Sequence, residues 1–321
     1  MISIIIPNLD GEKFLPSCLK SIEKQSEGLY EIIVVDNGSS DDSQNICAGF
    51  DDLKFVELKS NLGFSAAVNR GIKESSGEII FLLNNDTELD INCLLNIKTF
   101  FDKYDKVDIM ATKMLYFDAR NIINDTSDIF SIYGLAHQRG KGEVDINQYG
   151  ACERVFGACA GAAAYRKKVF VEVGLFDEDF FAYLEDIDFS FRANLLNKEC
   201  WYNPAAVVYH VDGGTSKKMG AFSFFLNHRN AAFVILKNIP SLLLFKILPF
   251  LLIGQARTLA AGIKHKKFNI ILKIYWQLIN DFPKILKKRR KIQKTRLIKN
   301  ADLFSLLSKK YPFNIRKSLF K

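Results

Sequence analysis

Residues 78–87 read EIIFLLNNDT, a short apolar run that ends abruptly in two amides, a carboxylate and a hydroxyl. The run at 78–83 predicts a buried strand, because it is β-branched at its centre and too short for a confident helix. A parallel α/β sheet binds its ligands just outside the carboxyl ends of its strands. A lone carboxylate there, Asp86, suits a divalent cation that takes its other ligands from a diphosphate and water. A turn that merely closes the strand explains the same residues equally well.

The preceding residues alternate between strand and helix patterns. Apolar runs at 2–6, 31–35 and 53–58 predict further strands, and apolar residues at helical spacing predict helices over 12–23 and 65–74. Strands separated by helices in this way indicate parallel crossover connections and a nucleotide-binding type of sheet. We therefore expect an α/β fold whose sheet is mostly parallel and covered by helices on both faces.

Polar residues also follow the other predicted strands. Asp36 is placed to accept hydrogen bonds from a base or a ribose hydroxyl, although it and Asn37-Gly38-Ser39 also suit a tight turn and a helix cap. Gly63 either lets a ligand approach the backbone closely or serves a turn alone. The chain has no Gly-x-Gly-x-x-Gly segment after its first strand and no Gly-Lys-Ser/Thr segment. This argues against dinucleotide dehydrogenases and phosphate-loop ATPases.

The charge of the chain is unevenly distributed. Residues 264–321 hold 18 of the 44 Lys and Arg residues, together with only Asp281 and Asp302 as acids. The net charge of +8 therefore divides into an acidic body and a strongly basic tail, which would attract nucleic acid or anionic lipid. The six cysteines lack metal-finger spacing and fit reduced core residues of a cytoplasmic protein. The N-terminal apolar run has no basic leader, so we expect no secretory signal.

Several motifs occur in an order that is similar to that of a known family. They are IIIPN at 4–8, IVVDNGS at 33–39, NLGF at 61–64 with NRG at 69–71, and LNND at 83–86. With them the chain resembles the nucleotide-sugar half of the family 2 glycosyltransferases, which have the GT-A fold. It resembles most the rhamnosyltransferase-like branch that builds bacterial surface polysaccharides.

This resemblance implies roles for individual residues. Asp36 would bind the pyrimidine of the donor, and Asp86 would bind a divalent cation, Mn²⁺ or Mg²⁺, on the donor diphosphate. The other donor-binding residues would be Pro7, Asn8, Asn61, Gly63, Asn69 and Asn85. The chain departs from the best-known Asp-x-Asp form of the metal motif, since Asn84 and Asn85 replace the other possible acids.

Residues 180–188 read FFAYLEDID and place three acids ahead of a helix predicted over 186–196. Acids at a helix N-terminus are ordinary capping residues, and Asp188 with Arg192 forms an i,i+4 pair that we interpret as structural. Family members have a similar Glu-Asp pair whose second acid is the catalytic base. The resemblance therefore implies Asp186 as the base, with Glu185 on the acceptor side. Inverting transfer needs one such base, whereas the leaving diphosphate needs positive charge.

Two other segments supply candidate site residues. A strand predicted over 205–209 ends at His210, ahead of a Gly213-Gly214 turn suited to phosphate. A lone His there is usually only a polar terminus, but the resemblance implies a ligand of the metal or the diphosphate. The small residues at 155–164 suit a closely approaching sugar ring or close packing equally well, and Gly161 is our acceptor-side candidate among them. Weak periodicity over 121–150 predicts an excursion or lid.

The last third of the chain raises the question of a membrane. Residues 222–230 resemble an Arg-Asn segment of the same branch, in which Arg229 either binds phosphate or pairs with an acid. The apolar run at 241–253 contains Lys246 and Pro249 and is shorter than the ~20 residues of a bilayer span. An interfacial helix is our first interpretation, ahead of a buried core helix and a true span. The basic segment at 282–291 suits anionic headgroups, with a solvated helix or nucleic-acid contact as alternatives.

Together these features predict an inverting glycosyltransferase, peripheral on the inner face of the cell membrane. We expect a GT-A catalytic domain at 1–235 (nucleotide-sugar half 1–117, acceptor half 118–235) and a helical, membrane-associating extension at 236–321. Its donor would be dTDP-rhamnose or a UDP-hexose, and its acceptor a glycan or polyprenyl-linked saccharide. We expect no nucleic-acid partner. An inactive nucleotide-sugar-binding scaffold with a partner-recruiting tail is the alternative. Nucleotidyltransfer is less favoured because the first strand lacks a Gly-rich basic loop.

Overall fold

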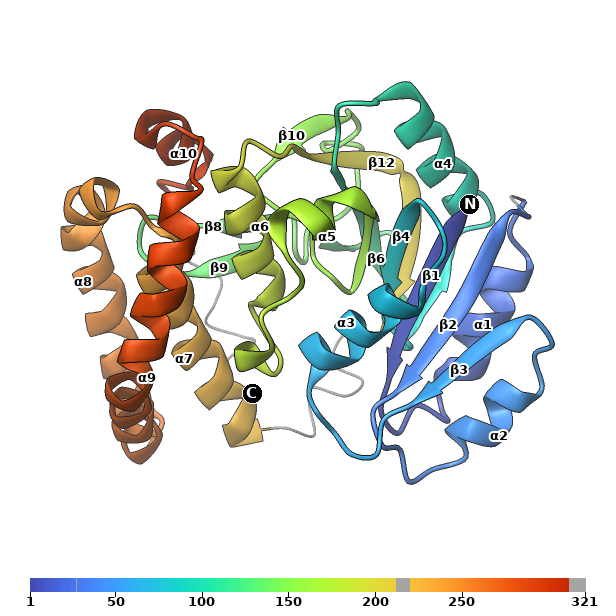
Figure 1. The fold of residues 1–321 in the computed structure, drawn as a ribbon, viewed down its shortest axis with the longest axis horizontal. Helices are drawn as coiled ribbons and strands as arrows, with labels where there is room; N and C mark the ends of the chain where they lie inside the picture. Colours follow the sequence, from blue (N-terminus) through green and yellow to red (C-terminus); the bar gives the residue numbers. More distant parts are fainter. Residues whose placement is uncertain (27, 212–219, 312–321) are drawn as a thin grey trace.

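The computed structural model describes residues 1–26, 28–211 and 220–311 and is built around a large mixed sheet (Figure 1). Its strands are β1 (Ile2–Asn8), β2 (Tyr30–Asp36), β3 (Leu53–Glu57), β4 (Ile79–Leu83), β5 (Thr87–Leu89), β6 (Ile109–Tyr116), β7 (Ile123–Asp125), β10 (Glu153–Val155), β11 (Ala162–Arg166) and β12 (Cys200–His210). They follow the order β10-β12-β6-β11-β4-β1-β2-β3, with β5 paired to β12 and β7 paired to β6. A separate strand pair joins β8 (Asp128–Phe130) to β9 (Ala136–Gln138).

The half of the sheet that contains β1 to β4 is parallel, as the alternation of strands and helices predicted. β1 pairs in parallel with both β2 and β4, and β2 pairs in parallel with β3. Ile5, Val34, Phe81 and Leu82 are all 0% exposed. A strand covered on both faces needs such a continuous apolar run, which is why the run at 78–83 could be recognised from sequence. The carboxyl ends of these strands meet at one edge of the sheet.

The other half of the sheet is mixed. β11 lies between β4 and β6 and runs antiparallel to both, whereas β6 and β12 are parallel to each other. Ala162, Ala163 and Ala164 of β11 are buried. Close strand packing therefore accounts for this part of the small-residue run. The antiparallel strand was not predicted, because it follows an excursion without helical or strand periodicity.

Helices cover both faces of the sheet, as expected for the α/β fold (Figure 1). One face carries α1 (Leu15–Glu23), α2 (Ser43–Ala48) and α4 (Cys93–Lys103), and the other carries α3 (Phe64–Glu74), α5 (Lys168–Val173) and α6 (Glu185–Leu195). Each set has its own apolar core against the sheet, with Leu19 and Ile97 in the first and Val68 and Phe189 in the second.

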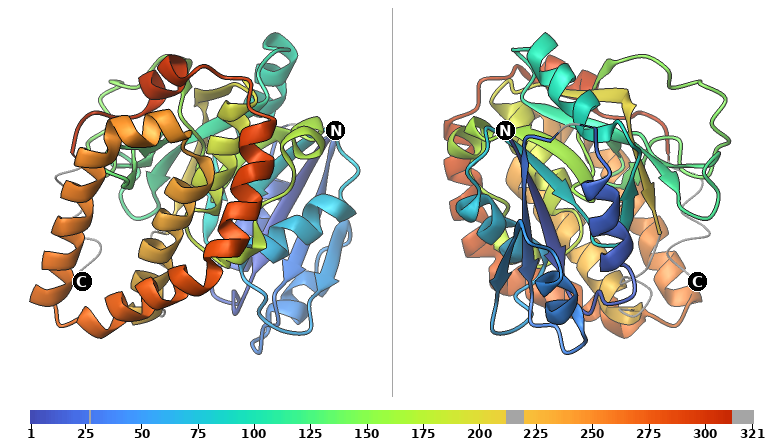
Figure 2. Two further views of the ribbon diagram at one scale, coloured as in Figure 1. Left: turned by 60° about the vertical axis from the view of Figure 1, so that its left-hand side comes forward. Right: turned by 90° about the vertical axis from the view of Figure 1, so that its right-hand side faces the viewer.

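Within the described residues, four further helices form a C-terminal bundle beside α6 (Figure 2). They are α7 (Gly220–Asn238), α8 (Ser241–Lys264), α9 (Phe268–Lys294) and α10 (Asn300–Leu306). A third apolar core joins the bundle to the body, because Ile187 and Phe191 of α6 pack with residues such as Phe233 and Ile247. The predicted boundary at residue 235 falls inside α7, and the division into two parts stays a prediction.

The apolar helix α8 has one buried face and one exposed face. Leu243, Ile247 and Leu251 pack into the third core, while Leu242 and Phe245 are 75% and 73% exposed. By length and composition alone, α8 is the one helix in the described part of the chain that could cross a membrane. One face of α8 is therefore buried, as in the core-helix alternative. The other face is exposed, and its contact with a membrane interface stays a prediction.

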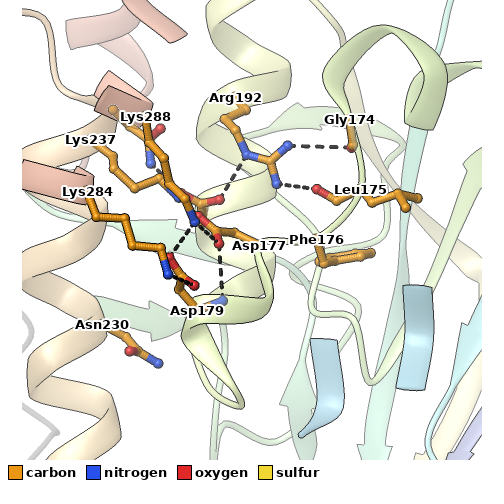
Figure 3. Close-up of polar contacts among 12 residues, drawn as sticks. Gly174, Leu175, Phe176, Asp177, Asp179, Arg192, Asn230, Lys237, Lys284 and Lys288 are labelled. Carbon is orange, nitrogen blue, oxygen red and sulfur yellow. Dashed lines mark hydrogen bonds and ion pairs between the residues drawn. The ribbon is translucent and has the colours of Figure 1, made fainter. Parts of the chain in front are cut away.

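A buried ion-pair network ties α7 to α6 and to the loop before it (Figure 3). Lys237 of α7 is 2% exposed and pairs with Asp177 and with Asp188, whose Oδ1 lies 2.8 Å from its Nζ. Asp188 also accepts a hydrogen bond from Nε of Arg192 at 2.9 Å. The predicted i,i+4 pair is thus present, and Arg192 extends the network to the carbonyl oxygens of Val173 and Leu175.

The basic segment of α9 is partly used inside the protein. Lys284 and Lys288 lie 2.5 Å from the carboxylate of Asp179, and Arg289 donates to the carbonyl oxygens of Leu236 and Ile239. These contacts fasten α9 to the loop before α6 and to the end of α7. They reduce the positive charge that residues 282–291 present to solvent. Lys284, Lys288 and Arg289 therefore give no support to the predicted contact of this segment with anionic headgroups.

Candidate active site

Polar side chains at the carboxyl ends of β1, β2 and β4 form one hydrogen-bonded chain. Nδ2 of Asn85 donates to Oδ1 of Asn8 at 2.7 Å, and Nδ2 of Asn8 donates to Oδ1 of Asp36 at 2.9 Å. Ser39 extends the chain, because both its N–H and its hydroxyl donate to Asp36. The parallel register explains this convergence, since Asn8 lies opposite Asp36 in the β1–β2 pairing. Three predicted donor-binding residues are therefore brought together.

Asn61 and Gly63, which were also predicted to bind the donor, connect to the residue after β2. Nδ2 of Asn37 donates to Oδ1 of Asn61 at 3.1 Å and to the carbonyl oxygen of Gly63 at 3.2 Å. Gly63 has a φ of 90°, and a Cβ there would lie 2.5 Å from the carbonyl oxygen of Phe181. Both features require glycine. The close approach that Gly63 permits is to the turn before α6, and its predicted contact with a ligand stays a prediction.

Pro7 and Asn69 lie outside this hydrogen-bonded chain. Pro7 is a β1 residue paired with Val35. Nδ2 of Asn69 donates to the carbonyl oxygen of Phe176 and to Oε1 of Glu178, both at 2.9 Å, and Oδ1 of Asn69 accepts from the Phe176 N–H. The Asn69 amide therefore holds the loop before α6, and no contact in the described residues links it to the other predicted donor-binding residues.

The two predicted metal ligands face each other. Oδ1 of Asp86 lies 3.3 Å from Nε2 of His210, because His210 pairs with Thr87 across β12 and β5 and the Val211 N–H donates to the Asp86 carbonyl oxygen. Two ligands held ~2.1 Å from one cation lie about 3 Å apart, so this pair fits a single divalent ion such as Mn²⁺ or Mg²⁺. The predicted Gly213-Gly214 turn lies outside the described residues.

A second residue orients His210. Nδ1 of His210 lies 3.0 Å from Oδ1 of Asn124, and a hydrogen bond between them has Nδ1 as the donor, since an amide oxygen only accepts. A bound cation would then be held through Nε2, the nitrogen that faces Asp86. Histidine ligands of metals usually have such a partner on the other nitrogen. Asn124 lies in β7, within the aperiodic excursion, and no sequence signal singled it out. A cavity of about 290 Å³ beside this pair is lined by Lys13, Phe14, Asp86, Phe117 and Asp118, among others.

The predicted base contacts the backbone just before β11. The Ala160 N–H donates to Oδ2 of Asp186 at 3.2 Å, and the Ile187 N–H donates to its Oδ1 at 2.8 Å. One residue after Ala160, the carbonyl oxygen of Gly161 accepts from the Asn84 N–H at 2.8 Å. The start of β11 thus links Asp186 to the Asn84-Asn85-Asp86 segment. A Cβ added at Gly161 would lie 3.2 Å from Nδ2 of Asn84, which is a tight contact.

Other buried acids surround Asp186. Burial raises the pKa of Asp186, while burial and the neighbouring Asp186 raise the pKa of Glu185. Asp125 and Asp128, from the excursion, are 1% and 6% exposed, and burial raises the pKa of Asp125 to about 7. One carboxylate oxygen of each has no hydrogen-bond partner among the described residues, and the same is true of Oε2 of Glu185. Neither excursion acid was identified from sequence, because β7 and β8 are too short to show a pattern.

This arrangement separates two chemical tasks. Asp86 and His210 can hold a cation beside the donor-side hydrogen-bonded chain, and Asp186 is a half-buried carboxyl group that can accept a proton when ionised. Among the described residues, the contacts given above join Asn8, Asp36 and Asn85 to one another and Asn61 and Gly63 to Asn37.

Comparison with known proteins identifies the family of the chain. The family model described as "Glycosyl transferase family 2" matches residues 3–174. A PGL/p-HBAD biosynthesis glycosyltransferase of Mycobacterium tuberculosis is 27% identical over 230 residues, which cover 70% of this chain and 79% of that protein. The poly-beta-1,6-N-acetyl-D-glucosamine synthase of Staphylococcus epidermidis is also 27% identical, over 63% of this chain and 50% of the synthase.

Solved structures share the fold. S. aureus TarS 1–349 in complex with UDP-GlcNAc aligns over 92% of this chain and 90% of that chain, with a TM-score of 0.56 and 17% identity. GalNAc-T7 with UDP, GalNAc and Mn²⁺ aligns over 73% of this chain and 47% of that chain, with a TM-score of 0.58 and 16% identity. The chain therefore spans about half of the synthase and of GalNAc-T7, and most of TarS 1–349.

Proposed function

This chain belongs to glycosyl transferase family 2 and is a glycosyltransferase. We propose that it transfers a sugar, with inversion at the anomeric carbon, from a nucleotide-diphosphate donor. The observation that carries the proposal is the pairing of two groups around the β4 end. Asp86 lies 3.3 Å from His210, and Asp186 is joined to the same strand end through Ala160, Gly161 and Asn84.

In the proposed reaction, Asp186 acts as the general base. The acceptor hydroxyl loses its proton to the Asp186 carboxylate while its oxygen bonds to the anomeric carbon of the donor sugar. The bond from that carbon to the diphosphate oxygen breaks at the same time, and its electron pair leaves with the nucleoside diphosphate. A divalent cation held by Asp86 and His210 would stabilise the charge on this leaving group. A single displacement of this kind inverts the sugar and uses no protein nucleophile.

The donor can be identified by a hydrolysis panel. TarS 1–349 was solved with UDP-GlcNAc, which supports a UDP-hexose here, and dTDP-rhamnose is the second candidate. We expect hydrolysis of one sugar among UDP-GlcNAc, UDP-glucose and dTDP-rhamnose when Mn²⁺ or Mg²⁺ is present, and loss of that hydrolysis with EDTA. A nucleotide sugar that binds tightly but is never turned over, even with an acceptor glycan, would instead support the inactive scaffold.

Removal of the Asp86 carboxylate should impair both metal binding and turnover. We expect Asp86→Ala to lower turnover on the order of 10²–10³-fold, since metal stabilisation of a leaving group contributes several kcal/mol. Mn²⁺ titration followed by electron paramagnetic resonance should show weaker binding in the same variant. Asp118→Ala is the matched control, because Asp118 lines the same cavity but is exposed. Unchanged Mn²⁺ affinity in Asp86→Ala would contradict the metal assignment.

We also propose that the enzyme works at an anionic membrane surface, where it meets a lipid-linked saccharide acceptor. The outward faces of α8 and α9 support this. Leu242, Phe245 and Leu252 of α8 are 75%, 73% and 61% exposed, and Trp276 and Ile279 of α9 are 70% and 73% exposed. Exposed Lys264 and Lys266 lie at the connection between the two helices. Apolar side chains beside basic ones are typical of a surface that inserts shallowly into anionic lipid.

Vesicle co-sedimentation tests this surface. Each large apolar side chain contributes roughly 1.5–3 kcal/mol when buried, so the double variant Phe245→Glu/Trp276→Glu should bind phosphatidylglycerol-containing vesicles at least about tenfold more weakly. Val171→Glu is the control, because Val171 of α5 is 85% exposed and lies outside the bundle. Equal recovery of the double variant and the unaltered enzyme would reject the membrane surface while leaving the proposed chemistry untouched.

A further inference from the structure

The turn that leads into α6 has an unusual backbone. Phe181, Tyr183 and Leu184 have φ values of 63°, 68° and 64°, although none of them is glycine. Such conformations cost on the order of 1–3 kcal/mol each and persist only where the surrounding structure holds them. Leu184 is the N-cap of α6 in the left-handed region, so this turn sets the direction in which Glu185 and Asp186 leave it.

A single side chain of α7 binds two carbonyl groups of this turn and the carbonyl group just before it. Nδ2 of Asn230 donates to the carbonyl oxygens of Phe180, Ala182 and Tyr183 at 3.0, 2.9 and 2.7 Å. Asn230 is 0% exposed and faces the loop from α7 (Figure 3). The carbonyl groups of Ala182 and Tyr183 lie outside any regular helix or strand, so this amide supplies hydrogen bonds that the turn's own backbone does not.

Arg229 fixes the orientation of that amide. Its Nε and Nη2 donate to Oδ1 of Asn230 at 2.9 and 2.7 Å, so the NH₂ group of Asn230 must point toward the turn. Nη2 of Arg229 also donates to the carbonyl oxygens of Asp179 and Phe180 at 2.9 and 3.0 Å. Among the described residues, Arg229 therefore donates hydrogen bonds to backbone carbonyl oxygens and to an amide oxygen. The sequence had led us to expect a phosphate or an acid as its partner.

The opposite side of the turn touches the donor side of the site. The Ser65 N–H donates to the carbonyl oxygen of Phe181 at 3.3 Å, and Gly63 leaves no room for a Cβ beside the same oxygen. The turn is thus held between α7 and the loop that begins α3. Any movement of residues 181–184 would displace Asp186 relative to the donor-side residues.

We propose that Arg229 and Asn230 are positioning residues that hold the left-handed turn at 181–184 and thereby place the Asp186 carboxylate for proton transfer. The proposal rests on the proposed function, because it assigns how the general base is held. Under this proposal, α7 contributes to catalysis by holding the general base in place. The planar fork of Arg229 is needed to reach both the amide and the carbonyls, and lysine cannot reproduce it.

Hydrogen exchange of the full chain tests the proposal without any substrate. We expect Asn230→Ala to speed exchange of the amides at 181–186 by roughly tenfold or more, because the turn loses its bonds. Asn238→Ala is the matched control: Asn238 is also a 0% exposed asparagine of α7, but it donates to Asp188. Should Asn230→Ala fail to fold, the equally sized Asn230→Asp replaces it. Unchanged exchange at 181–186 would overturn the proposal.

Turnover supplies the second readout. With whichever nucleotide sugar of the panel the unaltered enzyme hydrolyses, Asn230→Ala and Arg229→Lys should lower kcat roughly 10²-fold with little change in KM, since misplacing a catalytic group by about 1 Å has this effect. The acidic limb of the pH–rate profile should also move in these variants and stay in place in Asn238→Ala. An equal loss of kcat in Asn238→Ala would overturn positioning in favour of general destabilisation. If Asn230→Ala speeds exchange at 181–186 but the unaltered enzyme hydrolyses none of the nucleotide sugars, the proposed function is refuted while the role of Asn230 in holding the turn stands.

Discussion

Asp186→Asn should lower the turnover of the enzyme by about 10²–10⁴-fold without unfolding it, because a positioned general base contributes a factor of that size. Asparagine has nearly the same shape as aspartate and can still accept the hydrogen bond from the Ile187 N–H. It cannot take the proton of the acceptor hydroxyl. The measurement is kcat for transfer to an acceptor glycan, together with thermal unfolding by circular dichroism.

The pH dependence of the reaction gives a second test of the same residue. Burial raises the pKa of Asp186, and only the ionised carboxylate can accept a proton. Activity should therefore fall as the pH drops through this raised pKa, at a pH above the usual aspartate value of about 3.9. Asp108→Asn is the control, because burial also raises the pKa of Asp108, but Asp108 precedes the amino end of β6. Near-normal turnover in Asp186→Asn would eliminate Asp186 as the base.

Lys237→Met should reduce the free energy of unfolding by about 3–5 kcal/mol, because it leaves buried carboxylates without a partner. Lys237 is 2% exposed and pairs with Asp177 and Asp188, of which Asp188 is 0% exposed. The expected loss lies at the lower end of that range, since Lys288 and Arg192 still contact these two acids. Urea unfolding at neutral pH measures the difference.

The control for this prediction is a lysine of the same network that is exposed. Lys284 pairs with Asp179 but its side chain is 58% exposed, so Lys284→Met should cost at most about 1 kcal/mol. Burial raises the pKa of Asp177, but Lys237 and Lys288 outweigh this and leave it lowered. Its contribution to stability is therefore present at neutral pH and is lost as the pH falls from about 3.9 through the lowered native pKa. Equal losses for the two lysine variants would show that burial of the pair is unimportant.

Local patterns predicted the parallel half of the fold and the polar residues that meet at its carboxyl edge. β4 and the strands beside it are continuous apolar runs, because both of their faces are covered, and a polar residue at the end of such a run must lie at the sheet edge. Asp36 and Asp86 were recognisable for this reason. The position of Asp186 also followed from a motif next to a helical pattern, and His210 from the end of an apolar strand.

Other features could not be predicted from local sequence. β11 enters the sheet antiparallel between β4 and β6, after an excursion of short strands with no period. That excursion supplies Asn124 beside His210 and the buried acids Asp125 and Asp128. The bonds of Asn69 to the loop before α6 were also not visible in the sequence, and its predicted donor contact stays a prediction.

The sequence by itself determined which strands end in a carboxylate and which helix begins with the Glu185-Asp186 pair, because burial and capping leave periodic or adjacent signals. Only the tertiary structure decided how these groups are held. Asn230 and Asn124 act on residues 50 and 86 positions away in the chain, respectively, and Lys237 on residues 49 and 60 positions away. Such contacts depend on how helices and loops pack, and a single buried amide or lysine carries no periodicity that would reveal its partner.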